Sequence, residues 1–139
     1  IATCLDGKIL VDVTVPLVPP KVARVQLPEA GSAVVNVQRI LGDNVRVVSA
    51  FQNVSAHHLN DLDQKIECDV LVCGDDIEAR EETIKLVAAA GMRGIHAGPL
   101  VNSVVSESLT SVLIGINRRY KIPGAGVIIT GLSDDSGTD

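Results

Sequence analysis

The sequence contains almost no aromatic side chains, with one phenylalanine, one tyrosine and no tryptophan in 139 residues. Proteins that bind single-stranded nucleic acid use aromatic rings as stacking platforms, so the composition argues against that class. Positive charge is also scarce, since 12 Lys and Arg face 17 Asp and Glu for a net charge of −5. A nucleic-acid surface needs clustered Lys and Arg. We therefore expect no nucleic-acid partner.

Long apolar runs are missing as well. A membrane-spanning helix needs about 20 consecutive apolar residues, and the sequence has no uninterrupted run of that length, so we expect no membrane partner. With 46% hydrophobic and 21% charged residues, the chain has the composition of about one folded domain. The three cysteines, Cys4, Cys68 and Cys73, adjoin apolar strand residues. This pattern favours buried thiols in a cytoplasmic protein over disulfides.

The usual catalytic motifs are also absent: there is no nucleophile elbow, no Walker loop and no pair of spaced cysteine couples. The segment Gly124-Ala125-Gly126 follows a predicted helix and precedes a predicted strand, which is the reverse of a dinucleotide fingerprint. It indicates either a tight turn or a close backbone approach to a flat ligand. Adjacent His57 and His58 point in different directions in any regular element, so we predict no metal site there.

The hydrophobic pattern predicts alternating strands and helices, and hence an α/β fold. Strands are expected at 8–15, 46–51, 69–73, 94–97 and 127–132, and helices at 31–41, 75–90 and 101–121. Asp75 is the expected N-cap of the second helix, with Glu78 completing a capping box and Gly91 as its stop. Its buried stripe is predicted as Ile77, Ile84, Val87 and Ala88. The stripe of the third helix is predicted as Val101, Val105, Leu109, Val112, Leu113 and Ile116.

Three predicted strands end in small, apolar or amide residues, at 16–19, 52–55 and 98–100. In an open parallel sheet, ligands bind outside the carboxyl ends of the strands. These exits offer apolar walls and almost no titratable group. Such a site suits hydride transfer between two bound cofactors, because the cofactors supply the chemistry while the protein positions them and excludes water.

Four motifs then occur in order: VVSAFQNVSA at 47–56, CDVLVCGDD at 68–76, AGPLVNS at 97–103 and ESLT at 107–110. Together they resemble the C-terminal two thirds of the NADP reductases that use an 8-hydroxy-5-deazaflavin coenzyme, coenzyme F-420. The resemblance implies an oxidoreductase that moves a hydride between the reduced deazaflavin and NADP. It implies no catalytic residue and no metal, because the cofactors carry the reaction.

The resemblance also implies positions for the cofactors. The predicted cofactor-binding residues lie in four stretches and comprise Leu17, Val18, Pro19, Gln52, Val54, Ser108, Thr110, Ala125 and Gly126. Gln52 departs from relatives that have histidine at this position. Arg118, Arg119 and Lys121 could meet the anionic tail of the coenzyme, or they could offset the dipole at a helix C-terminus.

The resemblance further predicts the organisation of the chain. Residues 1–43 would be the end of a Rossmann-like NADP-binding domain, 44–132 a smaller helical and β subdomain on the deazaflavin side, and 133–139 a disordered tail. The glycine-rich loop of the family would precede Ile1, and roughly 80 further residues would be needed to supply it. We therefore expect a fragment, without the N-terminal βαβ units, that binds NADP weakly or not at all.

Three other functions remain open at this point. The same fold could use a flavin, as in the reductase domains of membrane ferric reductases, which have a similar stretch to 47–56. The chain could instead be an inactive dimerisation module that associates through the apolar helix at 101–116, and we expect a homodimer or a larger homo-oligomer. A ligand-binding regulator would fit the composition, although no residue argues for it.

Overall fold

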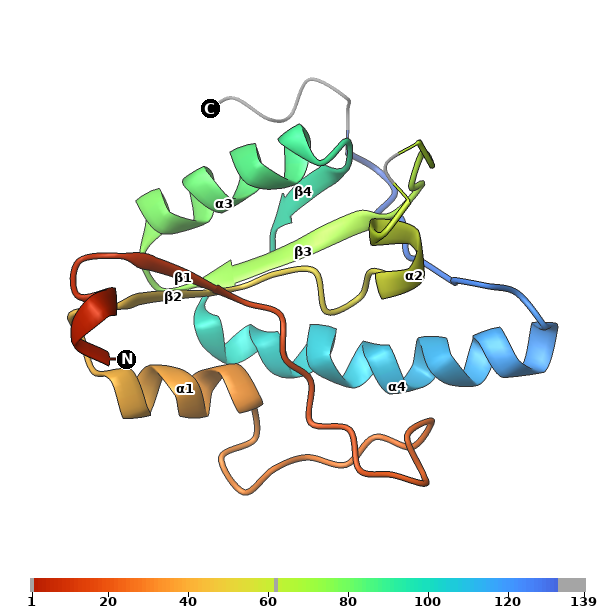
Figure 1. Ribbon diagram of the computed structural model, residues 1–139, viewed down its shortest axis with the longest axis horizontal. Coiled ribbons are helices and arrows are strands. Elements are labelled where there is room, and N and C mark those ends of the chain that lie inside the picture. The colour runs from red at the N-terminus through yellow and green to blue at the C-terminus, as the bar shows by residue number, and fades with distance from the viewer. Residues whose placement is uncertain (1, 62, 133–139) are drawn as a thin grey trace.

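The structure is a computed structural model that describes residues 2–61 and 63–132. It contains the strands β1 (Ile9–Asp12), β2 (Arg46–Ser49), β3 (Asp69–Gly74) and β4 (Arg93–His96). The helices are α1 (Ala33–Leu41), α2 (Ala56–Leu59), α3 (Ile77–Ala89) and α4 (Ser103–Tyr120). Short 3-10 helices, η1 (Ala2–Leu5) and η2 (Leu100–Asn102), precede β1 and α4 (Figure 1). The predicted α/β class is confirmed.

The four strands form one sheet in the order β1-β2-β3-β4. β1 and β2 are parallel, β3 and β4 are parallel, but β2 and β3 are antiparallel, with Val48 opposite Gly74 and Ser49 opposite Cys73. The expectation of a parallel sheet is therefore wrong at its centre. As a consequence, the chain leaves β1 and β2 at one end of the strands, whereas it leaves β4, at 98–100, at the opposite end.

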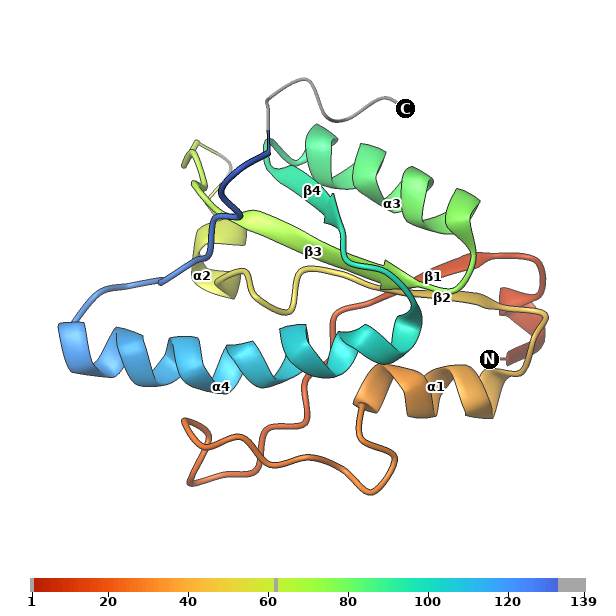
Figure 2. The ribbon, with the colours of Figure 1, turned by 180° about the vertical axis from the view of Figure 1, so that it is seen from behind.

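Helices cover both faces of the sheet, with α3 on one side and α1 and α4 on the other (Figures 1 and 2). Neighbouring residues of β2 face opposite sides, as strand geometry requires. Val48 packs in the cluster beneath α3 with Val70, Val72 and Val87. Val47 packs on the other side, in a cluster with Val34, Val45 and Leu100. The β-branched residues of β2 thus hold both layers onto the sheet.

Helix α1 begins and ends close to the predicted bounds. Ser32 is its N-cap, with an extended backbone and a side-chain oxygen that accepts a hydrogen bond from the Val35 N–H at 3.1 Å. Gly42 ends it with a φ of 74°, a conformation that glycine adopts without steric cost.

Helix α3 also forms where expected, but its cap and its buried face differ from the prediction. Asp76 is the N-cap and accepts the Ala79 N–H at 2.7 Å. Asp75 instead accepts the Leu100 N–H at 2.9 Å and so holds the start of η2. The buried residues are Ala79, Thr83 and Val87, whereas Ile77 and Ala88 are exposed. A Cβ at Gly94 would lie 3.1 Å from the Ile84 side chain, so the glycine allows α3 to pack closely on β4.

Helix α4 differs most from the prediction, because its buried face is not the predicted one. Half of its predicted apolar stripe is exposed, at 62% for Val101, 61% for Val105 and 47% for Val112. The buried side is mainly polar and comprises Ser103, Ser106, Glu107, Ser111 and Leu113. By length and composition alone, Leu100–Tyr120 could also cross a membrane. Its buried carboxylate is satisfied by α1 within the domain, which is the behaviour of a packed helix.

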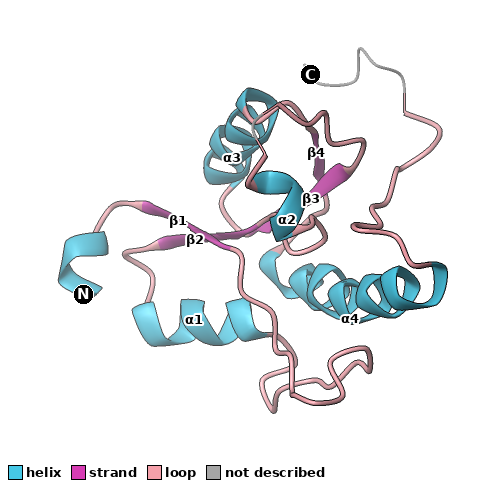
Figure 3. Cartoon of the chain, turned by 45° about the vertical axis from the view of Figure 1, so that its right-hand side comes forward, coloured by secondary structure: helices cyan, strands magenta, loops and turns pink. Residues whose placement is uncertain are grey.

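The predicted strand at 127–132 is not formed. The chain after α4 runs back as a loop (Figure 3), joined to β3 by a hydrogen bond from the Asp69 N–H to the Val127 carbonyl at 2.8 Å. The Asp69 carboxylate accepts the Ile129 N–H at 2.6 Å and a bidentate pair from Arg93. The hydrogen bond to the Asp69 side chain takes the place of backbone hydrogen bonds that a strand would form here. The expected tail at 133–139 lies outside the described residues.

Candidate functional site

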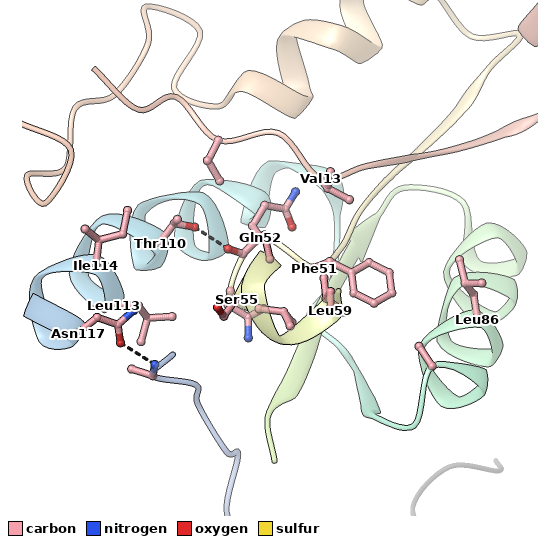
Figure 4. Close-up of a pocket in the computed structure, with 16 residues that line it drawn as sticks. Val13, Phe51, Gln52, Ser55, Leu59, Leu86, Thr110, Leu113, Ile114 and Asn117 are labelled. Carbon is pink, nitrogen blue, oxygen red and sulfur yellow. Dashed lines mark hydrogen bonds between the residues drawn. The ribbon is translucent and has the colours of Figure 1, made fainter. Parts of the chain in front are cut away.

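A mainly apolar cleft of about 650 Å³ lies where β1 and β2 leave the sheet. Its walls come from the segments that follow these strands, from α2, from the end of α3, from one face of α4 and from the returning loop (Figure 4). The residues that line the cleft include Val13, Phe51, Gln52, Thr110, Leu113 and Asn117. Because β4 runs antiparallel to β1 and β2, the residues that directly follow β4 do not line this cleft.

The floor of the cleft is a sharp turn after β2. Phe51 has a φ of 68°, which is uncommon for a residue with a bulky side chain. Such a left-handed conformation costs roughly 1–2 kcal/mol. The turn closes with a hydrogen bond from the Val54 N–H to the Phe51 carbonyl at 3.0 Å. This turn leaves Gln52 and Asn53 buried, and both then bind neighbouring elements.

Three hydrogen bonds tie this turn to the rest of the fold. Gln52 Nε2 donates to the Asp12 carbonyl at 2.8 Å, which joins the turn to the end of β1. Thr110 Oγ1 donates to the Gln52 carbonyl at 2.7 Å, which joins it to α4. Asn53 Nδ2 donates to the Asp69 carbonyl at 2.6 Å, which joins it to β3. The polar atoms of the turn are thus used mainly to fix its position.

The α4 wall follows the helical period. Thr110, Leu113, Ile114 and Asn117 are spaced at i, i+3, i+4 and i+7, so they share one face. Asn117 Oδ1 accepts the Ala125 N–H at 2.6 Å, which holds the returning loop against the helix (Figure 4). This contact joins α4 and the returning loop where both line the cleft.

None of the side chains that line the cleft is titratable. Neither of the two buried cysteines, Cys68 and Cys73, lines the cleft. Burial raises the pKa of the Cys73 thiol to about 11 and raises that of Cys68 as well. The site therefore offers shape, apolar walls and a few amides and hydroxyls, and no group suited to acid, base or nucleophilic catalysis.

A second, polar pocket of about 240 Å³ lies behind the returning loop, and its lining includes His58, Cys68 and the Gly124-Ala125-Gly126 segment. A Cβ at Gly124 would overlap the His58 ring, and one at Gly126 would come 2.9 Å from Cys68 Sγ. The two glycines therefore allow the backbone to approach side chains of the protein itself. Ala125 lines both pockets.

The structure brings together four of the nine predicted cofactor-binding residues. Gln52, Val54, Thr110 and Ala125 line the cleft. Gly126 lines only the polar pocket, while Leu17, Val18, Pro19 and Ser108 line neither. In the described part of the chain, no group of three His, Cys, Asp or Glu side chains is placed to hold a metal ion. Of the three thiols, Cys4 is exposed, contrary to the expected burial.

Sequence reasoning missed several lining residues, notably Val13, Phe51, Leu113, Ile114 and Asn117. The helical spacing from Thr110 to Asn117 was a usable signal for the α4 wall. No local signal marks Val13, because its role depends on the pairing of β1 with β2.

No protein-family model matches the chain. A curated protein of Methanocaldococcus jannaschii named F420-dependent NADP reductase is 44% identical over 132 residues, covering 92% of this chain and 59% of that protein. Proteins of the same name from Methanothermobacter marburgensis and Methanothermobacter thermautotrophicus are 36% and 35% identical, covering 94% and 91% of this chain and 60% and 57% of their own lengths. The chain is homologous to the F420-dependent NADP reductases.

A solved structure with the same fold points to the same group of proteins. The crystal structure of a putative F420-dependent NADP reductase from Arthrobacter sp. FB24 superposes with a TM-score of 0.77 at 25% identity, covering 93% of this chain and 60% of that one. A hypothetical protein from Sinorhizobium meliloti shares the fold at a TM-score of 0.56 and 21% identity, over 70% of this chain and 48% of its own. The resemblance seen in the four sequence motifs is confirmed. The chain spans about three fifths of the length of the curated reductases that it matches.

Proposed function

We propose that the chain forms the deazaflavin-binding part of an oxidoreductase that transfers a hydride between reduced 8-hydroxy-5-deazaflavin and NADP. The observation that carries the proposal is the mainly apolar cleft without a titratable side chain. The names of the homologous reductases supply the chemical identity of the two cofactors. Because the chain covers about 59% of the M. jannaschii protein, the activity is proposed for the whole enzyme.

The cleft fits this class of ligand. A volume of about 650 Å³ lies within the range of roughly 300–1,000 Å³ that holds drug-sized ligands and cofactors. Phe51, Val54 and Leu113 offer apolar contact, which suits a flat ring system. When bound, the deazaflavin supplies the carbon that gives or takes the hydride. An acid or base in the protein is not required for that transfer.

The side chains of the chain then have three tasks. Apolar walls exclude water from the reacting faces, which prevents side reactions. The Thr110–Gln52 and Asn117–Ala125 hydrogen bonds fix two walls relative to each other, so that the ring is held in one orientation. The uncharged environment keeps the ligand in place without competing proton transfers. No residue of the chain needs to form a covalent bond with the ligand.

The test is a fluorescence titration of the chain with the oxidised deazaflavin. We expect saturable binding that is lost in Ala56→Trp, because the indole would fill the cleft that Ala56 lines. His57→Trp, at the next, exposed position outside the cleft, is the matched control and should bind normally. Riboflavin as a competitor distinguishes a flavin site: displacement at equal concentration would favour the flavin-dependent class instead. Loss of binding in neither variant would contradict the cleft assignment.

We also propose that the protein is a cytoplasmic homo-oligomer. The exposed side chains of Val101 at the end of η2 and of Val105 and Val112 on α4 support association through this surface. Free thiols at Cys4, Cys68 and Cys73 support a reducing compartment. Sedimentation of the chain and of Val105→Lys would test the interface. A mass that is unchanged by the substitution, and equal to one chain in both, would contradict it.

A further inference from the structure

The cleft ends beside an unusual concentration of positive charge. Three of the 12 Lys and Arg residues, Arg118, Arg119 and Lys121, fall within four positions at the end of α4. All three are exposed. Elsewhere, Arg46, Lys85 and Arg93 are paired with carboxylates. No ion pair or side-chain hydrogen bond to the three cations occurs between the residues that the structure describes.

Helix geometry places two of these cations on the side of the cleft. Residues four positions apart lie on the same face, one turn further along. Arg118 lies four positions after Ile114, which lines the cleft. Lys121 is the left-handed C-cap of α4, and its N–H donates to the carbonyl of the cleft residue Asn117, so its backbone lies directly beyond Asn117. At about 100° per residue, Arg119 points to the opposite side of the helix from Asn117 and Thr110.

The local backbone brings the end of α4 next to the returning loop that lines the cleft. Lys121 ends α4 in the left-handed conformation, with φ of 54° and ψ of 44°. The chain then turns back, so that the Ala125 N–H reaches Asn117 Oδ1 at 2.6 Å. The mouth of the cleft and the end of the helix are thus parts of one turn. If the three cations served only to offset the helix dipole, all three would be expected to act alike, whichever face of the helix they occupy.

We propose that Arg118 and Lys121 bind an anionic group, a phosphate or carboxylate, on the side chain of the ligand whose ring lies in the cleft. This inference rests on the function proposed above and specifies the second half of the ligand. The apolar cleft takes the ring, and the two cations supply charge-assisted contacts at its mouth. The role of Arg119 is limited to the helix end.

The test compares two ligands: intact coenzyme F-420, with its anionic chain, and the ribityl deazaflavin that lacks this chain. At low salt, we expect the unmodified protein to bind the intact coenzyme about tenfold more tightly, as expected for two charge-assisted contacts at an exposed site. The preference should shrink at 0.5 M salt because of screening. The double variant Arg118→Gln with Lys121→Gln should bind both ligands equally. Arg119→Gln, the control, should keep the full preference.

Several results would overturn the inference. Equal binding of both ligands by the unmodified protein would exclude an anion contact. Equal loss in Arg119→Gln would show a non-specific effect of charge. A loss of NADP affinity in the double variant, with deazaflavin binding unchanged, would assign the cations to the other cofactor. If neither deazaflavin binds, the proposed function itself fails. Circular dichroism of each variant verifies that α4 remains folded.

Discussion

Glu107 on α4 accepts a hydrogen bond from the hydroxyl of Ser32, the N-cap of α1, at 2.6 Å across 75 positions of sequence. The same carboxylate accepts the backbone N–H of Ala33 at 2.8 Å and of Val34 at 3.3 Å. Because Ser32 gives its proton to Glu107, Ser103 is the donor in the 2.7 Å contact between the two serines. A buried negative charge is thus satisfied by the N-terminus of a helix, where the helix dipole favours it.

This relationship predicts a stability effect. Glu107 is 2% exposed, and Glu107→Gln removes its charge and one acceptor, so that a helix N–H loses its partner. We expect a loss of about 2–3 kcal/mol in the free energy of unfolding, measured by urea denaturation. Glu78→Gln, on an exposed carboxylate with 85% of its side chain accessible, should change stability by less than about 0.5 kcal/mol. Equal effects would contradict the capping role.

The Asp69–Arg93 pair predicts a pH dependence. Hydrogen bonds from Arg93 hold the pKa of the Asp69 carboxyl below its usual value, and Asp69 is buried. A lowered pKa means that the folded state is stabilised above the unfolded pKa of about 3.9, and that this contribution is lost as pH falls toward the folded value. We expect the melting temperature to fall more steeply between pH 5 and pH 3 in the unmodified protein than in Asp69→Asn. The control variant, Asp6→Asn, changes an exposed carboxylate and should keep the steep profile.

The cleft geometry predicts different effects for two neighbouring hydroxyls of α4. Thr110→Val keeps the volume but removes the donor to the Gln52 carbonyl, which should lower deazaflavin affinity about fivefold by loosening the turn. Ser108→Ala should change affinity by less than about twofold, because Ser108 does not line the cleft. Titration of both variants decides the point. The opposite order would support the assignment of Ser108 made from family resemblance.

The thiols predict a reactivity order. The raised pKa of Cys73, about 11, leaves little thiolate at pH 8, and Cys68 is buried with a raised pKa as well. Cys4 is exposed. Iodoacetamide should therefore label Cys4 in the native protein, with Cys73 slower by more than about a hundredfold. Mass spectrometry after timed quenching measures this order. Rapid native labelling of Cys73 would show that the sheet opens locally.

The order of helices and strands was largely predictable, because it depends on local patterns. The helical spacing of apolar residues up to Leu41 predicts α1, and the apolar runs around Val47 and Val70 predict two strands close to where they occur. The strand expected at 127–132 fails for a non-local reason. Its backbone bonds partly to the Asp69 side chain, which is itself held by Arg93. A strand pattern does not reveal such a competing acceptor.

The candidate site was predictable only in part. The turn at 52–54 and Thr110 were identified from the family resemblance, and both line the cleft. The expected convergence of three strand exits is wrong, because β2 and β3 are antiparallel. Periodicity identifies a strand but carries no information on the direction of its neighbour.

The sequence by itself therefore determined most of the helices and strands, the absence of titratable groups from the turn after β2, and the relationship to the reductases. The tertiary structure decided which segments meet at the cleft and which face of α4 is buried. The physical reason is the range of the interactions. Caps and periodicity act within a few residues, whereas the contact between Glu107 and the start of α1 joins positions 75 residues apart. That contact turns a polar face inward and leaves the apolar face of Val101 and Val105 exposed.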